Sequence, residues 1–156
     1  MFSFKGPNLM RKFFVGLLVL NVPLFVPAAP ARDTEYQLSI QEVMRDPEYK
    51  QKLGNEVAFF FGTQETPAIE RSFGDSITNR KSNSFGKSDQ SACRWAMLSA
   101  LMSLRERALR MGGKAVVNIH NYHKVNLALT DVDYECHAGP IIAGVALKGT
   151  VVILKN

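Results

Sequence analysis

The sequence predicts an α+β fold in which an antiparallel sheet packs on one long amphipathic helix, with a short N-terminal helix and one disulfide. Two patterns favour this fold. Between residues 88 and 111, apolar side chains recur at three- and four-residue spacings, as on one face of a helix. The segments on both sides are short, rich in β-branched and aromatic residues, and separated by glycine and proline, as strands are. One helix covering one face of a sheet is an α+β layer arrangement.

The first 31 residues are predicted to be a signal peptide that lies outside this fold. Three basic residues precede an apolar run, FFVGLLVLNVPLFV at 13–26, and Ala29-Pro30-Ala31 matches the A-x-A pattern of a cleavage site. Cleavage after Ala31 leaves residues 32–156 as a single periplasmic domain without a membrane anchor. The alternative is a retained N-terminal anchor, although the run is short for a membrane span and contains an asparagine and a proline.

The predicted mature chain carries little net charge. The full chain has 19 basic and 14 acidic residues, a net charge of +5. Three basic residues and no acidic ones precede Arg32, which leaves 16 basic against 14 acidic residues, a net charge of +2. This excess is too small to indicate nucleic acid or an anionic membrane surface as a partner.

The N-terminal half of the domain predicts short elements and one long loop. Ser39 and Glu42 have capping-box spacing for a short helix, which Pro47 interrupts. After the strand-like segments, a stretch rich in serine, asparagine, lysine and glycine shows no periodicity, which is typical of a loop. The predicted elements are strands at 36–40, 57–62 and 68–73, a helix from 40 to about 53, and a loop at about 74–91.

The C-terminal half begins with the clearest element of the chain. Ser88 or Asp89 can cap a helix that ends at Gly112, and its apolar stripe includes Cys93. Three strand-like segments follow the helix, and the last of them is long. They are KAVVNIHNY at 114–122, DYECHAG at 133–139 and IIAGVALKGTVVIL at 141–154.

The two cysteines predict one disulfide. An even number of cysteines in an exported chain favours pairing, and the alternative is two buried free thiols. Side chains alternate between the faces of a strand, so Cys136 can point from its strand toward the helix. Cys93 lies on the helix stripe that faces the sheet, which makes a Cys93–Cys136 bond consistent with the predicted layers.

The same alternation yields a candidate metal site on the outer face of the sheet. It places His120 and His137 on this face as possible cross-strand neighbours, with Glu135 nearby. His123 is three residues after His120, so on a regular strand it points to the opposite face. Two imidazoles and a carboxylate can bind Zn²⁺ or Cu²⁺ weakly. The alternative is a set of solvated strand histidines without a ligand or cofactor.

No catalytic residues are recognisable, so we do not expect an enzyme. The serines have no identifiable base and orienting partner. Gly86-Lys87-Ser88 has the ending of a phosphate-binding loop, but Lys81 stands where the motif needs its first glycine. These three residues therefore predict only a loop and a helix cap.

Long segments of the chain resemble known exported proteins. GKSDQSACRWAMLSALMSLRERALRMGGKAVVNIHNY, YECHAG and AGVALKGTVV resemble small exported bacterial proteins that often carry the automatic name excinuclease ATPase subunit, an activity that the incomplete phosphate loop does not support. More distantly, the helix followed by GGKAVVNI is similar to the YbjQ-like family and to the periplasmic domain of RcsF-type envelope-stress lipoproteins. In the latter, a disulfide ties the start of the helix to a later strand, which implies that role for Cys93 and Cys136.

These observations together predict a periplasmic domain that acts through a protein partner in envelope maintenance or stress sensing, without catalysis. The alternative function is the binding of a small ligand or a metal ion by His120 and His137.

Overall fold

The computed structural model describes residues 32–123 and 130–155, so the predicted signal peptide at 1–31 lies outside the described residues. None of the described helices is both long and apolar enough to cross a membrane. The elements, in order, are β1 (Thr34–Ser39), α1 (Ile40–Arg45), α2 (Pro47–Leu53), β2 (Ala58–Phe61), β3 (Ile69–Asn83), α3 (Asp89–Met111), β4 (Ala115–Asn121), β5 (Asp133–Ala138) and β6 (Ile142–Leu154).

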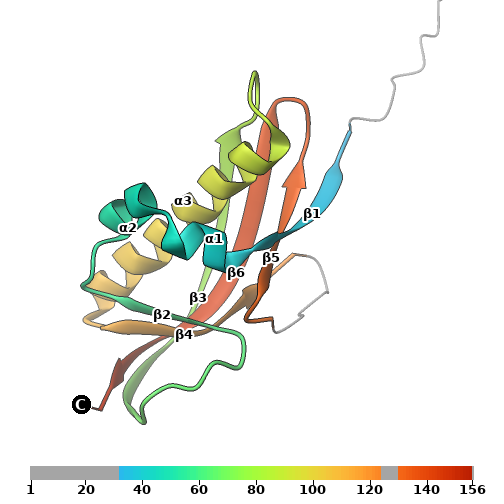
Figure 1. Cartoon of the computed structure of the whole chain (residues 1–156). Coiled ribbons are helices and arrows are strands. Elements are labelled where there is room, and N and C mark those ends of the chain that lie inside the picture. The colour runs from blue at the N-terminus through green and yellow to red at the C-terminus, as the bar shows by residue number, and fades with distance from the viewer. Residues whose placement is uncertain (1–31, 124–129, 156) are drawn as a thin grey trace, which may run out of the picture. The chain divides into compact units, whose positions relative to one another are not determined.

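Strand β6 organises the sheet (Figure 1). One of its edges pairs antiparallel with the whole of β3, from Ile69 opposite Leu154 to Asn83 opposite Ile142. Its other edge is shared, because β4 pairs with its C-terminal half and β5 with its first residues. Strand β1 extends the sheet antiparallel to β5, and β2 extends it parallel to β4. The prediction of a wholly antiparallel sheet is therefore wrong for β2, which is parallel to β4. The two strands can be parallel because β3 and α3, which separate them in the sequence, carry the chain back to the end at which β2 began.

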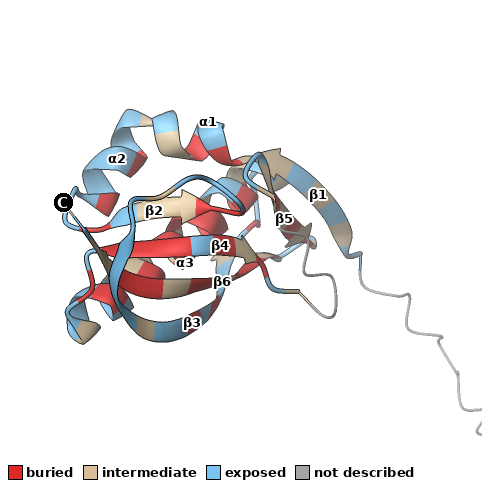
Figure 2. Ribbon diagram, turned by 90° about the horizontal axis from the view of Figure 1, so that it is seen from below, coloured by how far each residue is buried: buried red, intermediate tan, exposed pale blue. Residues whose placement is uncertain are grey.

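Helix α3 covers one face of the sheet, as its apolar stripe predicts. The Ser88 hydroxyl accepts a hydrogen bond from the Ser91 backbone N–H, and Gly112 ends the helix in the left-handed conformation. Its side chains on the inner face are fully buried, among them Met97, Leu101 and Leu104. Figure 2 shows that β4 and β6 are largely buried and that β3 is mostly exposed, so the core lies between α3 and the middle of the sheet.

The predicted long loop at 74–91 is wrong, because most of it belongs to β3. This strand pairs with β6 along its entire length, although its core-facing side chains are polar. Ser76 and Thr78 are buried there, and Arg80 donates a hydrogen bond to the Ser103 hydroxyl of α3 at 2.8 Å. Backbone pairing with β6 does not depend on apolar side chains, so a segment of polar composition forms a strand here that its composition does not predict.

The predicted N-terminal helix is present as two pieces, α1 and α2. They meet at Asp46, whose carboxylate accepts hydrogen bonds from the backbone N–H groups of Glu48 and Tyr49. Pro47 occupies the first turn of α2, where a missing N–H costs nothing. The helix is therefore interrupted before Pro47, as expected, and Asp46 at the interruption is the N-cap of α2.

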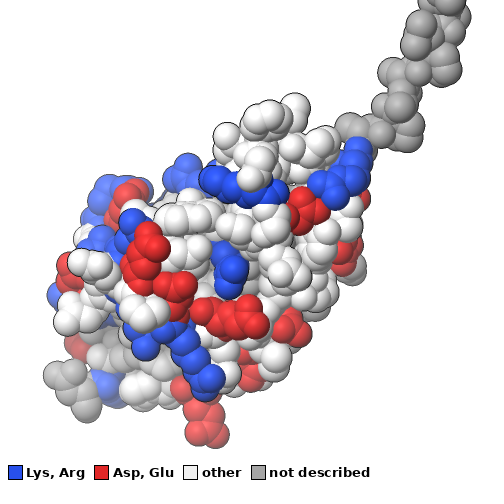
Figure 3. All heavy atoms as spheres, turned by 45° about the horizontal axis from the view of Figure 1, so that its top comes forward, with Lys and Arg blue, Asp and Glu red and all other residues white. Residues whose placement is uncertain are grey.

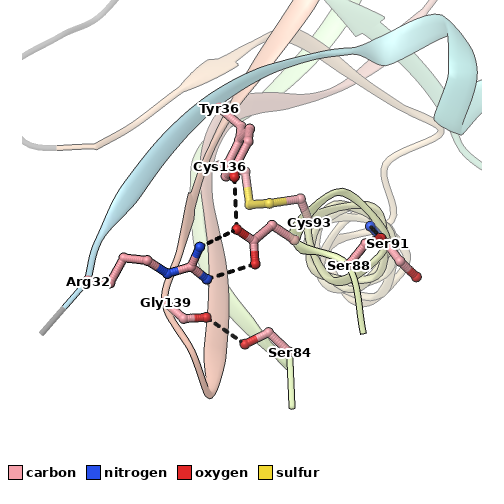
Figure 4. A network of polar contacts seen from close by, with 9 residues as sticks. Arg32, Tyr36, Ser84, Ser88, Ser91, Cys93, Cys136 and Gly139 are labelled. Atoms are coloured by element: carbon pink, nitrogen blue, oxygen red, sulfur yellow. Dashed lines mark hydrogen bonds and ion pairs between the residues drawn. A yellow bond between two sulfur atoms is a disulfide. The ribbon is translucent and has the colours of Figure 1, made fainter. Parts of the chain in front are cut away.

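The predicted disulfide is confirmed. Cys93 and Cys136 are bonded, with their Cα atoms 5.8 Å apart, and both residues are fully buried. The bond joins the first turns of α3 to the middle of β5, as Figure 4 shows. It therefore fixes the helix to the part of the sheet that carries Glu135 and His137.

Candidate metal site

Three ligand-type side chains meet on the outer face of the sheet, opposite α3. His123, Glu135 and His137 each offer one atom of a kind that binds metal ions, and these atoms all lie within 4.8 Å of one another. All three residues are half-buried and line a cavity of about 350 Å³. The cluster therefore contains Glu135 and His137 of the predicted site, with His123 as its second histidine.

The middle of β5 supplies two of the three ligands. Glu135 and His137 alternate with Cys136, so they point outward while the cysteine points toward α3. One Glu135 carboxylate oxygen, Oε1, lies 2.8 Å from Nε2 of His137, and Oδ1 of Asp33 lies 3.2 Å from Nδ1. Both ring nitrogens of His137 therefore face carboxylate oxygens, which fixes the plane of the ring.

His123 completes the cluster from just beyond the end of β4. Its ring stacks on that of His137, with centroids 4.0 Å apart and an interplanar angle of 20°. Its Nε2 atom is buried and has no hydrogen-bond partner among the described residues. A buried polar nitrogen without a partner carries a desolvation cost, which a bound cation would remove.

Asn121 positions the end of β4 against β5. Its side chain is buried, and its amide oxygen accepts a hydrogen bond from the Glu135 backbone N–H at 2.9 Å. Strands β4 and β5 are not paired with each other, so this side-chain contact is what connects the last residue of β4 to the proposed ligand Glu135. The chain then places His123 two residues further on, over His137.

The sequence predicted His120 as the partner of His137, and the structure corrects this. His120 pairs with Lys148 of β6, whereas His137 pairs with Gly144, four residues away and therefore roughly 13 Å along the strand. The ring of His120 contacts the backbone oxygen of Asn118 at 2.6 Å instead. It also lies near Asp75, whose pKa is held below its usual value mainly by the Lys148 ammonium and the Thr150 hydroxyl.

His123, Asp33 and Asn121 were missed for a topological reason. The alternation of side chains along a strand predicts a direction for His123 only if the strand includes it. Strand β4 ends at Asn121, so the prediction does not apply to His123. A register shift after Val117 and the positive φ of Asn118, 52°, also break the alternation inside β4. Only the HxxH spacing in the sequence hinted at His123, and nothing pointed to Asp33.

A second polar network lies at the start of β1 (Figure 4), and one of its members, Arg32, also lines the cavity. Arg32 donates two hydrogen bonds to the Asp89 carboxylate, at 2.9 and 3.0 Å, and the Tyr36 hydroxyl donates a third at 2.8 Å. The Arg32 guanidinium, followed by the Tyr36 hydroxyl, lowers the pKa of Asp89. Because Asp89 begins α3, the network holds β1, and with it Asp33, against the helix.

The ligand set suits a transition metal. Imidazole and carboxylate groups bind Zn²⁺ and Cu²⁺, and tetrahedral ligands at about 2.1 Å lie roughly 3.4 Å from one another. Small side-chain rotations would close the present spacing of up to 4.8 Å. A hydrogen bond from His137 Nδ1 to Asp33 would leave Nε2 free to bind, as a carboxylate behind a ligand histidine does in metal sites. If these three side chains held a four-coordinate ion, its fourth position would be available to water or another ligand.

No protein-family model and no curated protein match this chain. Among solved structures, it is similar to a protein of unknown function from Pediococcus pentosaceus that belongs to the DUF74 family. The match has 14% sequence identity and a TM-score of 0.42, and covers 62% of this chain and 98% of the other. A likeness of this size does not establish a shared fold, and the function of that protein is itself unknown.

Proposed function

We propose that this protein is an exported, single-domain protein that binds a divalent transition metal ion, Zn²⁺ or Cu²⁺, through His123, Glu135 and His137. The observation that carries the proposal is the buried Nε2 of His123, which has no hydrogen-bond partner among residues 32–123 and 130–155 and lies beside two further metal-binding groups. The proposal keeps the metal-binding alternative drawn from the sequence and replaces His120 with His123.

The chemistry of the cluster favours a cation over other ligands. Glu135 and Asp33 both face His137, so the cluster can compensate the charge of a metal ion without further protein groups. The cavity lining described contains no serine, threonine or cysteine that could act as a nucleophile. Histidine ligands must be neutral to bind, so we expect affinity to fall on acidification as protons compete with the metal.

The proposed compartment is the periplasm. The Cys93–Cys136 disulfide is typical of an oxidising compartment, which agrees with the predicted signal peptide. The protein partner in envelope maintenance or stress sensing, expected from the sequence, stays a prediction.

Calorimetric titration of Zn²⁺ and Cu²⁺ into the metal-free protein tests the function. We expect saturable binding that weakens more than about 100-fold in His123→Ala, His137→Ala and Glu135→Gln, and about 10- to 100-fold in Asp33→Asn. His120→Ala is the matched control, because it removes the remaining histidine but no proposed ligand, and we expect unchanged affinity. No binding by the parent protein, or an equal loss in His120→Ala, would overturn the proposal.

Urea unfolding supplies a second readout. A ligand that binds only the folded state at 100 times its dissociation constant raises the free energy of unfolding by about 2.7 kcal/mol. We expect this increase with Zn²⁺ for the parent protein and for His120→Ala, and its absence for His123→Ala.

A further inference from the structure

Three large apolar side chains are exposed together at one end of the domain. Phe85, in the turn between β3 and α3, is 76% exposed. Ile141, in the turn between β5 and β6, is 64% exposed, and Ile142, the first residue of β6, is 48% exposed. They line an open groove of about 420 Å³ together with residues 81–83. We call Phe85, Ile141 and Ile142 the apolar tip. None of them is a proposed metal ligand, although Ile142 also lines the cavity beside the metal cluster.

The two turns that carry the apolar tip form one fixed unit. The Ser84 backbone N–H donates to the Ile141 carbonyl at 2.9 Å, and its hydroxyl donates to the Gly139 carbonyl at 2.8 Å, the contact drawn in Figure 4. The Gly139 N–H in turn donates to the Ile142 carbonyl at 2.8 Å. The apolar side chains are therefore held at the surface by ordered backbone, in turns that lie side by side at the top of Figure 1.

Positive charge lies around the apolar tip. Lys81 lines the groove and Lys87 belongs to the same turn as Phe85. Neither forms an ion pair among the described residues, whereas the nearby Asp89 is already neutralised by Arg32. Figure 3, in which the top of Figure 1 comes forward, shows an uncharged projection with Lys and Arg side chains, and also acidic ones, at its base. The net charge of +2 does not predict this local arrangement.

The chain enters the domain at this same end. A Cβ added to Gly139 would lie 2.9 Å from the carbonyl oxygen of Arg32, so the first described residue lies against the turn between β5 and β6. Residues 1–31, which precede it, contain the apolar run at 13–26. The apolar tip therefore lies at the same end of the domain as Arg32.

We propose that the apolar tip inserts into the interface of an anionic phospholipid bilayer, with Lys81 and Lys87 contacting the headgroups. Apolar side chains at turns, flanked by lysines, match the two contributions to interfacial binding, apolar burial and attraction to anionic lipid. A second protein chain fits less well, because a stable interface buries roughly 1,000 Å² or more and three side chains on two turns offer little of that area.

Vesicle co-sedimentation tests the proposal on the chain that begins at Arg32, in EDTA, so that the result does not depend on metal binding. The unit Ala31–Asn156 holds all the described elements. We expect binding to phosphatidylglycerol-containing vesicles and much weaker binding to pure phosphatidylcholine vesicles. Phe85→Ser with Ile141→Ser should weaken binding at least about tenfold, and Lys87→Ala about fivefold.

Val132→Ser is the matched control, because Val132 is 62% exposed but lies at the other end of β5. We expect its vesicle binding and its urea midpoint to equal those of the parent protein, and the tip variants to keep that midpoint too. Absence of binding to both kinds of vesicle, or equal loss in Val132→Ser, would overturn the proposal. So would a concentration-dependent dimer in sedimentation velocity that the tip variant abolishes, because a second copy would then be the occupant.

Discussion

The two faces of β5 are built by different means. On the inner face, Cys136 is fully buried and bonded to Cys93 of α3. On the outer face, Glu135 and His137 are half-buried and held by single polar contacts to Asp33 and to each other. Neighbouring residues of one strand therefore belong to a covalently fixed core and to a cluster held by polar contacts.

The difference shows which residues each face requires. The inner face needs only residues whose partners lie on the regular elements β5 and α3. The outer face needs His123, which lies beyond the end of β4, and Asp33, which precedes β1. Because the core depends on a covalent bond and the site on polar contacts, we expect stability and metal affinity to respond to different substitutions.

The largest effect on stability is expected from removing the disulfide. Cys93→Ser with Cys136→Ser opens a loop with a sequence separation of 43, which should lower the free energy of unfolding by about 4 kcal/mol. Strands β1 and β6 still hold β5 in register, so we expect the Zn²⁺ affinity of the folded variant to fall less than about tenfold. Urea unfolding and calorimetry measure the two quantities.

A Zn²⁺ affinity that falls more than about 100-fold in this double variant, while circular dichroism still shows the folded protein, would contradict the independence of the two faces of β5. It would mean that the disulfide positions Glu135 and His137 directly, so that the two faces form one unit.

A smaller effect is expected at Asn121, which links the two strands that supply the ligands. Asn121→Ala leaves the Glu135 backbone N–H without its partner, which should cost about 2 kcal/mol. It should also loosen His123 and weaken Zn²⁺ binding, so that both properties change together. Asn118→Gly controls for general damage, because it removes an amide from the same strand but no contact to β5, and glycine suits the positive φ of 52° at this position. Unchanged Zn²⁺ affinity in Asn121→Ala would show that His123 is positioned independently.

The smallest effect is expected at Asp89 and depends on pH. Because Arg32 and Tyr36 lower the pKa of Asp89 in the folded protein, this carboxylate stabilises the fold above its unfolded pKa of about 4. That stabilisation is lost as the pH falls through the lower, folded value. Urea midpoints of Asp89→Asn should therefore lie below those of the parent protein at pH 7 and approach them near pH 3. A constant difference across this range would contradict the assignment.

Much of the inner face could be predicted from the sequence. The spacing of apolar residues predicts α3, and strand alternation brings Cys93 and Cys136 to the same layer. Only the beginning of β3 was predicted, as the strand at 68–73. The rest of β3 could not be predicted, because its buried positions include Ser76 and Thr78 and its stability comes from pairing with β6. The parallel direction of β2 likewise follows from a crossover that no local pattern specifies.

The sequence by itself determined the long helix, the disulfide pairing and the candidate ligands Glu135 and His137. Each of these depends on the local periodicity or the residue chemistry of one segment. Only the tertiary structure decided that His123 rather than His120 joins them, and that two distant turns form the apolar tip. Both outcomes depend on the positions at which β3, β4 and β5 pair with β6. The periodicity of a single strand does not encode which residues of a distant strand it pairs with.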